Sequence, residues 1–386
     1  MRRATMTPRE RVRAALHHQE PDRVPVDLAQ AAGDGIVVGA YRNLLHYLGL
    51  GDRPIQVSST FTQSVTVDED VLRRFHVDFR GVEIGGPDGW KDIILPDDSY
   101  QDEWGVVRRR PPDGLYYDLV GSPLAEIDTI SGLDTYHWPD PYNPGRFRGL
   151  REKAKRLRDE TDYAIVLNVN CTFFLRCAEL RGWENFYADL AGNKEFICTL
   201  MDRYLDWRLA VAERALEEAG EYADVVMCTS DDLAGSNELL ISPKMYRELI
   251  KPRQQRTFDF FKARTDAVRL YHNDGAIYPL INDFIEIGVE ALNPIQVSAA
   301  GMGDTKKLKA EFGDKLCFWG AIDTHHVLPH GSTEEVRQEV KRRIQDLGPG
   351  GGYVVCSVHN IQSDVPPENI VAMFDAVQEF GWYPLA

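Results

Sequence analysis

The chain has 386 residues, of which 43% are hydrophobic, and its formal net charge is -16. This length and apolar content allow a large buried core, whereas the negative charge disfavours nonspecific binding to nucleic acid or to an anionic membrane. No apolar run approaches the roughly 20 residues of a membrane-spanning helix. The first 18 residues are charged throughout and lack the apolar core of a signal peptide. We therefore expect a cytoplasmic protein.

Cysteine spacing and glycine patterns exclude several common sites. Six cysteines are scattered without a C-x-x-C pair, which argues against a disulfide framework and a zinc ribbon and favours reduced thiols. The glycine-rich segment 33–39 lacks a P-loop lysine, and no G-x-S-x-G elbow occurs. The three arginines 108–110 are expected to form a solvated edge, or else a lid that meets an anionic ligand.

Capping signals and apolar runs predict the elements in chain order. Thr7, Pro8 and Glu10 form a capping box that begins a helix reaching about residue 18. Residues 100–120 predict a β-hairpin around a P-P-D-G turn. Helices are expected over about 173–190, 194–219, 243–262, 277–287, 333–347 and 368–380, and Ser332 with Glu335 forms a second capping box. Short apolar runs predict eight strands, over 21–28, 77–84, 163–170, 223–232, 267–274, 290–296, 316–323 and 353–358.

Eight buried strands that alternate with helices predict a (β/α)8 barrel of the TIM type. Parallel strands need crossover connections and are buried on both faces, which this pattern satisfies. An N-terminal helix precedes the barrel, and the hairpin is an excursion after the second strand. A doubly wound open sheet is the alternative, although no G-x-G-x-x-G follows the first strand. No linker divides the chain, so we expect one domain over residues 1–386.

Polar side chains gather where the predicted strands end, and in a barrel these ends form the mouth of the active site. Some of these residues are expected to be ordinary turn formers. The polar groups at these ends are Asp27, Glu83, Asn168, Asn170, Asp231, Asp232, His272, Asp274, Asn293, Gln296, Asp323 and His359.

The sharpest local signal is His272-Asn273-Asp274. Side chains alternate along a strand, so His272 and Asp274 point the same way and can bind one metal if a third ligand arrives. His359 on the last strand is the expected third ligand, and Cys356, of opposite parity to His359, is the alternative. A histidine hydrogen-bonded to a carboxylate without metal remains the simpler interpretation.

Asp231 and Asp232 are adjacent residues at the end of the fourth predicted strand. Their side chains must point in opposite directions, so only one can face the centre of the barrel. The inward residue is a candidate general base, metal ligand or hydrogen-bond acceptor. The alternative is that the pair caps a loop.

Four segments resemble the uroporphyrinogen decarboxylase superfamily: "TPRERVRAALHHQEPDRVPV", "NDGAIYPLINDFIEIGVEALNPIQ", "FWGAIDTHHVLP" and "GGGYVVCSVHNIQSDVPPENI". The resemblance covers nearly the whole chain and implies a (β/α)8 barrel that is often a homodimer. The superfamily contains true decarboxylases and zinc-dependent methyltransferases. The latter move methyl groups among methyl donors, corrinoid proteins and thiols such as coenzyme M.

Departures from the decarboxylase pattern argue against the namesake reaction. Its P-V-W-x-M-R-Q-A-G-R signature aligns with residues 25–34, where Gln30 and Asp34 replace the two arginines that hold substrate carboxylates. Its tyrosine falls at Ala178, and Glu83 is nearest to its aspartate. Only the histidine of its late G-H-G-I motif is kept, as His359.

The methyltransferase branch implies a metal site in this chain. Its H-x-C pair and later cysteine correspond to His272, Asp274 and His359, which remain competent Zn²⁺ ligands. The resemblance therefore implies a metal-assisted methyltransferase with a small-molecule substrate and a corrinoid carried by a partner protein, or a thiol, as methyl acceptor.

Two other hypotheses remain open. The first is a metal-free decarboxylase or lyase of a small acid or a uroporphyrinogen-like tetrapyrrole, with His359 and Asp231 or Asp232 as acid and base. The second is a nonenzymatic corrinoid- or tetrapyrrole-binding protein. The residues expected to bind substrate are Gln30, Glu83, Asn170, Asn293, Asp323 and Asn360.

Overall fold

The central sheet is parallel, and its strands lie in space in the same order as in the chain. The computed structural model describes residues 4–31, 33, 35–112, 114 and 116–385. A doubly wound sheet would reverse its strand order partway across, so the sequential order supports the barrel. The seven strands are β3 (Phe79–Glu83), β8 (Ala164–Asn168), β9 (Val225–Ser230), β10 (Val268–His272), β11 (Ala291–Asn293), β12 (Cys317–Ile322) and β13 (Tyr353–Ser357).

The predicted first strand is not a regular strand, but its segment joins the two edges of the sheet. Val26 forms an isolated parallel bridge with Val355 of β13. On its other side, the Asp78 N–H donates to the Val26 carbonyl (2.9 Å), and the Val26 N–H donates to the Asp78 carboxylate (2.8 Å). Pro25 has no N–H, and a side chain takes the place of a backbone acceptor, so a regular ladder cannot form. The barrel is confirmed, with seven regular strands and this bridging segment.

Helices surround the barrel, and most follow the predicted positions. The capping boxes at Thr7–Glu10 and Ser332–Glu335 are both formed. The helix expected over 173–190 is instead two helices, because the chain turns at Gly182, whose φ is +84°. Among the described residues, no helix combines the length and apolarity needed to cross a membrane. The helices are α1 (Pro8–Leu16), α2 (Val38–Tyr47), α3 (Glu69–Arg74), α4 (Leu150–Glu160), α5 (Phe174–Arg181), α6 (Trp183–Gly192), α7 (Lys194–Ala219), α8 (Pro243–Met245), α9 (Lys251–Lys262), α10 (Ile281–Glu286), α11 (Thr305–Phe312), α12 (Val327–His330), α13 (Thr333–Leu347) and α14 (Pro367–Phe380).

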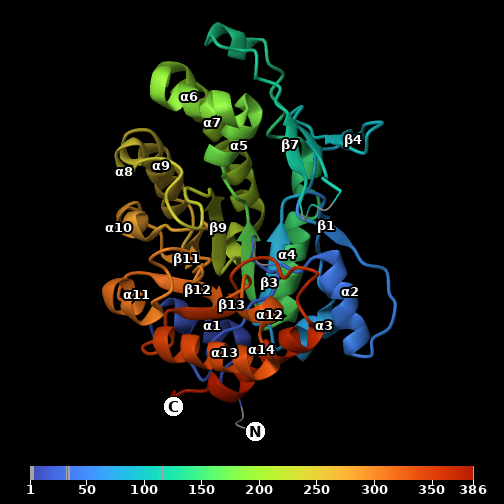
Figure 1. Ribbon diagram of the computed structural model, residues 1–386, viewed down its shortest axis with the longest axis vertical. Helices are drawn as coiled ribbons and strands as arrows, with labels where there is room; N and C mark the ends of the chain where they lie inside the picture. Colours follow the sequence, from blue (N-terminus) through green and yellow to red (C-terminus); the bar gives the residue numbers. More distant parts are fainter. Residues whose placement is uncertain (1–3, 32, 34, 113, 115, 386) are drawn as a thin grey trace.

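The excursion after β3 is larger than the predicted hairpin. It is a four-stranded antiparallel sheet of β4 (Ile93–Ile94), β5 (Tyr100–Gln101), β6 (Val107–Arg109) and β7 (Asp118–Gly121). The hairpin itself is confirmed as β6 and β7, whereas Asp113 and Leu115 at its turn lie outside the described residues. A further pair, β1 (Val57–Ser59) and β2 (Ser64–Val65), precedes α3. In Figure 1 the excursion lies at the upper right, on the same end of the molecule as α5 and α6, and both termini lie at the lower end.

Arg108 of the excursion is buried rather than solvated, contrary to the sequence-based expectation. Its guanidinium is paired with Asp102 (3.0 Å) and with Glu179 of α5 (2.6 Å). Arg176 of α5 forms a further ion pair with Asp102 (2.8 Å). Two arginines and two carboxylates therefore tie the excursion to α5, while the neighbouring Arg109 is exposed.

Side chains fill the interior of the barrel below its mouth. Phe79 of β3 and Trp319 of β12 meet there, with their ring centroids 4.7 Å apart. The same buried cluster includes Val166, Met227 and Cys356. This packing makes the interior of the barrel a core rather than a ligand-binding cavity, as in other parallel barrels.

Candidate metal centre

A cavity of about 740 Å³ lies at the carboxyl ends of the strands. Its wall combines strand ends, the loop before α2, the excursion and helices α5 and α7. This is the position of the active site in parallel barrels, and the volume suits a small molecule. Polar lining residues include Glu83, Arg108, Asn168, Asn170, Asp232, His272, His359 and Asn360.

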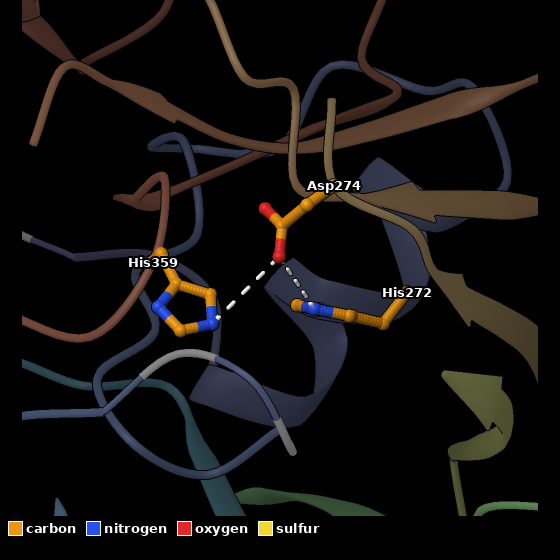
Figure 2. A group of neighbouring side chains, drawn as sticks. All are labelled: His272, Asp274 and His359. Atoms are coloured by element: carbon orange, nitrogen blue, oxygen red, sulfur yellow. Dashed lines mark hydrogen bonds and ion pairs between the residues drawn. The ribbon is translucent and has the colours of Figure 1, made fainter. Parts of the chain in front are cut away.

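Three ligand-type side chains converge at one side of this cavity. His272, Asp274 and His359 each offer one atom, and these atoms all lie within 4.8 Å of one another. The Asp274 Oδ2 lies 3.2 Å from His272 Nε2 and 3.7 Å from His359 Nε2. Figure 2 shows the carboxylate between the two imidazole rings. The predicted triad therefore exists as a spatial group, built from the end of β10 and the segment after β13.

His272 is held in a defined orientation from two sides. Its Nδ1 lies 2.5 Å from Oδ1 of Asn293, which is its direct register partner on β11. A methyl group built on Gly33 would lie 2.3 Å from the His272 Cε1 and Nδ1 atoms, so Gly33 packs directly against the ring. His272 itself is 3% exposed. The contact with Asn293 directs the other nitrogen, Nε2, towards Asp274.

A polar contact at Nδ1 orients the His359 ring as well. Its Nδ1 lies 3.4 Å from the hydroxyl of Tyr116, and this hydroxyl accepts a hydrogen bond from Gln362 Nε2 (2.7 Å). Burial lowers the pKa of His359, although the Asp274 carboxylate opposes this effect. The neutral form of the ring is therefore favoured, which is the form that binds metals.

Asp274 supplies the negative charge of the group. Burial opposes its ionisation, but the neighbouring His359 and His272 hold the pKa of the carboxyl below its usual value. In both histidines Nε2 faces Asp274, while Nδ1 contacts an oxygen of Asn293 or Tyr116. Two such imidazoles and one ionised carboxylate form the kind of donor set found at catalytic zinc sites. The residues present therefore fit a divalent metal.

Asp231 and Asp232 diverge as their adjacent positions predict. Asp231 is fully buried, and its Oδ1 accepts backbone N–H groups at the start of α5, from Phe173 (3.2 Å), Phe174 (2.9 Å) and Leu175 (3.2 Å). This is a helix-capping position. Asp232 lines the cavity, and its Oδ1 accepts the Asp274 N–H (3.0 Å).

Asp232 is therefore the aspartate of the pair that we retain as a candidate for proton transfer. Burial and the nearby Asp274 charge raise the pKa of its carboxyl to about 6. Such a value is close to neutral pH, which suits a general acid or base.

Three of the predicted substrate-binding residues line the cavity. Asn170 has a φ of +55°, and its side-chain oxygen accepts a hydrogen bond from the Thr172 hydroxyl. Asn360 accepts a hydrogen bond from Ser64 (3.1 Å), and Glu83 ends β3 with an exposed side chain.

The other predicted substrate-binding residues form hydrogen bonds with neighbouring protein groups. Asn293 holds His272, and Asp323 accepts the N–H groups of His325 (2.7 Å) and His326 (3.1 Å). The Gln30 amide donates to the Leu28 carbonyl (3.0 Å) and accepts from the Gly81 N–H (2.9 Å). These contacts give the three side chains structural roles within the barrel.

Three further positions complete the predictions from sequence. Cys356, the alternative ligand, points into the packed barrel interior with Trp319. Ala178 is fully buried on α5, and Asp34 lies outside the described residues. Sequence reasoning missed Tyr116, whose only signal was its place in the predicted hairpin.

These features define a parallel α/β-barrel protein with a polar cavity at the carboxyl ends of its strands. A family model described as Uroporphyrinogen decarboxylase (URO-D) matches residues 120–380, and the chain belongs to this family.

Similar proteins carry two different names. An uroporphyrinogen decarboxylase of Alkalilimnicola ehrlichii is 23% identical over 383 residues, covering 96% of this chain and 94% of the relative. Another, from Pseudoalteromonas translucida, is 35% identical over 96 residues, covering 24% of this chain and 27% of the relative. Among solved structures, a methyltransferase from Methanosarcina mazei matches with a TM-score of 0.65 and 18% identity, over 97% of this chain and 99% of that protein. At this identity the likeness shows the shared barrel fold alone.

Proposed function

We propose that this protein is a metal-assisted methyltransferase that demethylates a small substrate and delivers the methyl group to a corrinoid on a partner protein or to a thiol. The observation that carries the proposal is the convergence of His272 Nε2, His359 Nε2 and the Asp274 carboxylate within 4.8 Å at the cavity. Three protein ligands leave a position for substrate, which distinguishes a catalytic from a structural zinc site.

The residues around the cavity have separate tasks in this proposal. His272, Asp274 and His359 would hold Zn²⁺, which when bound would supply Lewis-acid activation of a substrate oxygen, nitrogen or sulfur. Asp232, with a pKa near 6, exchanges a proton with the heteroatom that loses the methyl group. Asn170, Asn360 and Glu83 provide polar contacts that orient the substrate.

The similar proteins support this choice only in outline. The Methanosarcina methyltransferase shares the fold across nearly the whole chain, and its name is consistent with methyl transfer. The relatives named as decarboxylases share the family, but Gln30 is committed to backbone hydrogen bonds and Ala178 is buried in the core. The corrinoid partner, the homodimer and the cytoplasmic location remain predictions.

Methyl transfer to free cob(I)alamin tests the proposal. The zinc-loaded protein is mixed with methyl ethers, methylamines and methyl thioethers, and the conversion of cob(I)alamin to methylcobalamin is followed by visible absorption. Cob(I)alamin provides the electron pair of the new carbon–cobalt bond, and the substrate heteroatom keeps its own pair and gains a proton. We expect conversion with one substrate class and its loss in His272→Ala and His359→Ala. Conversion that is equal in these variants would contradict the proposal.

A metal-free carboxy-lyase is the second candidate, because Asp232 and His359 line the same cavity and the Asp232 pKa is about 6. In that case His359 and Asp232 would transfer protons to a small acid without a metal. Carbon dioxide release that survives exhaustive chelation and the His272→Ala substitution would favour this candidate over the first.

A further inference from the structure

We infer that Tyr116, carried by the excursion, is the positioning residue that holds His359 ready to bind the metal. The inference rests on the proposed function, because it takes His359 as a ligand of a divalent metal. Tyr116 belongs to the segment between β6 and β7, far in sequence from β13, yet its hydroxyl lies 3.4 Å from His359 Nδ1.

Several contacts fix the Tyr116 side chain. Its hydroxyl accepts a hydrogen bond from Gln362 Nε2 (2.7 Å), three residues after His359. Its ring lies edge-on to the His359 ring, with centroids 6.3 Å apart, and stacks on Phe61 at 6.0 Å. The Tyr117 N–H also donates to the Phe61 carbonyl (3.4 Å), a second contact between these two segments.

The excursion that carries Tyr116 is itself anchored to the barrel. Arg108 of β6 is 5% exposed and pairs with Glu179 of α5 at 2.6 Å, and Asp102 pairs with Arg176 of α5 at 2.8 Å. A pair of ionic contacts on one helix restricts the movement of the small sheet. The strand that precedes the Tyr116 segment is therefore tied to the wall of the barrel.

A phenol hydroxyl suits both states of the histidine. Metal binding through Nε2 requires the proton on Nδ1, and the Tyr116 oxygen then accepts a hydrogen bond from it. When the proton is on Nε2 instead, the same hydroxyl donates to Nδ1. Tyr116 therefore satisfies Nδ1 in either tautomer and keeps Nε2 directed at Asp274.

Tyr116→Phe removes the hydroxyl and keeps the ring that stacks on Phe61. Tyr117→Phe is the matched control, because Tyr117 is equally half-buried and packs on Tyr100 instead, with centroids 5.2 Å apart. Zinc affinity is measured by competition with a chromogenic chelator, and the visible spectrum of the Co²⁺-loaded protein reports the ligand geometry. We expect about tenfold weaker zinc binding and an altered cobalt spectrum in Tyr116→Phe, as for other partners of metal-bound histidines. Tyr117→Phe should match the wild type within twofold.

A double-mutant cycle identifies the residue through which Tyr116 acts. In a His359→Ala background, adding Tyr116→Phe should cause no further loss of affinity, whereas in a His272→Ala background its effect should persist. An effect that remains undiminished without His359 would overturn the inference, as would wild-type affinity in Tyr116→Phe.

Nitrogen NMR of the metal-free protein separates this inference from the proposed function. With ¹⁵N-labelled histidine, the His359 signals are assigned by their loss in His359→Ala. Tyr116→Phe should shift these signals and leave those of His272 in place. Wild-type protein that binds no metal would refute the metal centre alone, but unshifted His359 signals would overturn the role of Tyr116.

Discussion

His272 and Asn293 are direct neighbours across β10 and β11, and the Nδ1 of the histidine lies 2.5 Å from the amide oxygen of the asparagine. The pairing fixes which nitrogen of His272 faces Asp274. Because both residues sit in regular strands, the barrel itself sets the orientation of this candidate ligand. Asn293 therefore orients a candidate metal ligand from the neighbouring strand.

Removal of the Asn293 amide should weaken metal binding. We expect Asn293→Ala to reduce zinc affinity by about 10- to 100-fold, since partners of metal-bound histidines commonly contribute this much. Asn293→Asp keeps an acceptor oxygen for His272 Nδ1 and should bind zinc within a few-fold of wild type. Chelator competition on both variants checks the prediction, and equal affinity in Asn293→Ala and wild type would refute it.

Gly33 should be required for the position of the His272 ring. Its φ is +105°, and an added Cβ would come within 2.3 Å of the imidazole. Gly288 is the matched control, because its φ is +95° but an added Cβ would meet nothing within 4 Å. Both alanine variants should lose roughly 1–2 kcal/mol of stability from backbone strain.

Only Gly33→Ala should also lose metal affinity, because only that methyl group displaces His272. Urea unfolding and zinc titration of the two variants separate strain from displacement. A Gly33→Ala protein that binds zinc as tightly as Gly288→Ala would show that Gly33 does not position the ring.

The two adjacent aspartates should give opposite phenotypes. Asp231→Ala removes the acceptor of three N–H groups at the start of α5 and should destabilise the fold by about 1–3 kcal/mol, with zinc affinity unchanged. Asp232→Asn keeps an acceptor for the Asp274 N–H but loses its titratable proton, so turnover should fall by about 100-fold at near-normal stability. Thermal unfolding measures the stability of the two variants, and steady-state kinetics measure their turnover. A stable Asp231→Ala protein with low turnover, beside an unstable Asp232→Asn protein, would refute the assignment.

Much of the barrel could be predicted because its strands are buried, apolar and end in polar residues. The first strand was overestimated, because the apolar pattern was given more weight than Pro25, which lacks an N–H. The side-chain acceptor that Asp78 supplies to Val26 leaves no signal in the local sequence. Strands β4 and β5 have two residues each and carry no detectable periodicity.

The candidate site was predictable where residues lie on one strand. The i and i+2 spacing of His272 and Asp274 led to a pair that lies 3.2 Å apart. Contacts between distant segments left no local pattern, as with Tyr116 and His359, which are 243 positions apart. The packing of Gly33 on His272 depends likewise on the folded path of the loop before α2.

Uroporphyrinogen III should not be a substrate. Gln30, which stands where the decarboxylase has an arginine, has its amide engaged by the Leu28 carbonyl and the Gly81 N–H. A neutral and occupied group cannot replace a charge-assisted contact to a substrate carboxylate. Incubation with uroporphyrinogen III should yield no coproporphyrinogen above a protein-free control, and enzyme-like conversion would show that the alignment of residues 25–34 is wrong.

Metal content tests the central claim most directly. The protein is purified without chelator, and its zinc and other divalent metals are quantified by elemental analysis beside His272→Ala and His359→Ala, with folding of all three verified by circular dichroism. We predict close to one metal ion per wild-type chain and little metal in either variant, because the three donor atoms converge within 4.8 Å. A folded wild-type protein that is purified without metal, and that added zinc neither binds nor stabilises, would contradict the account.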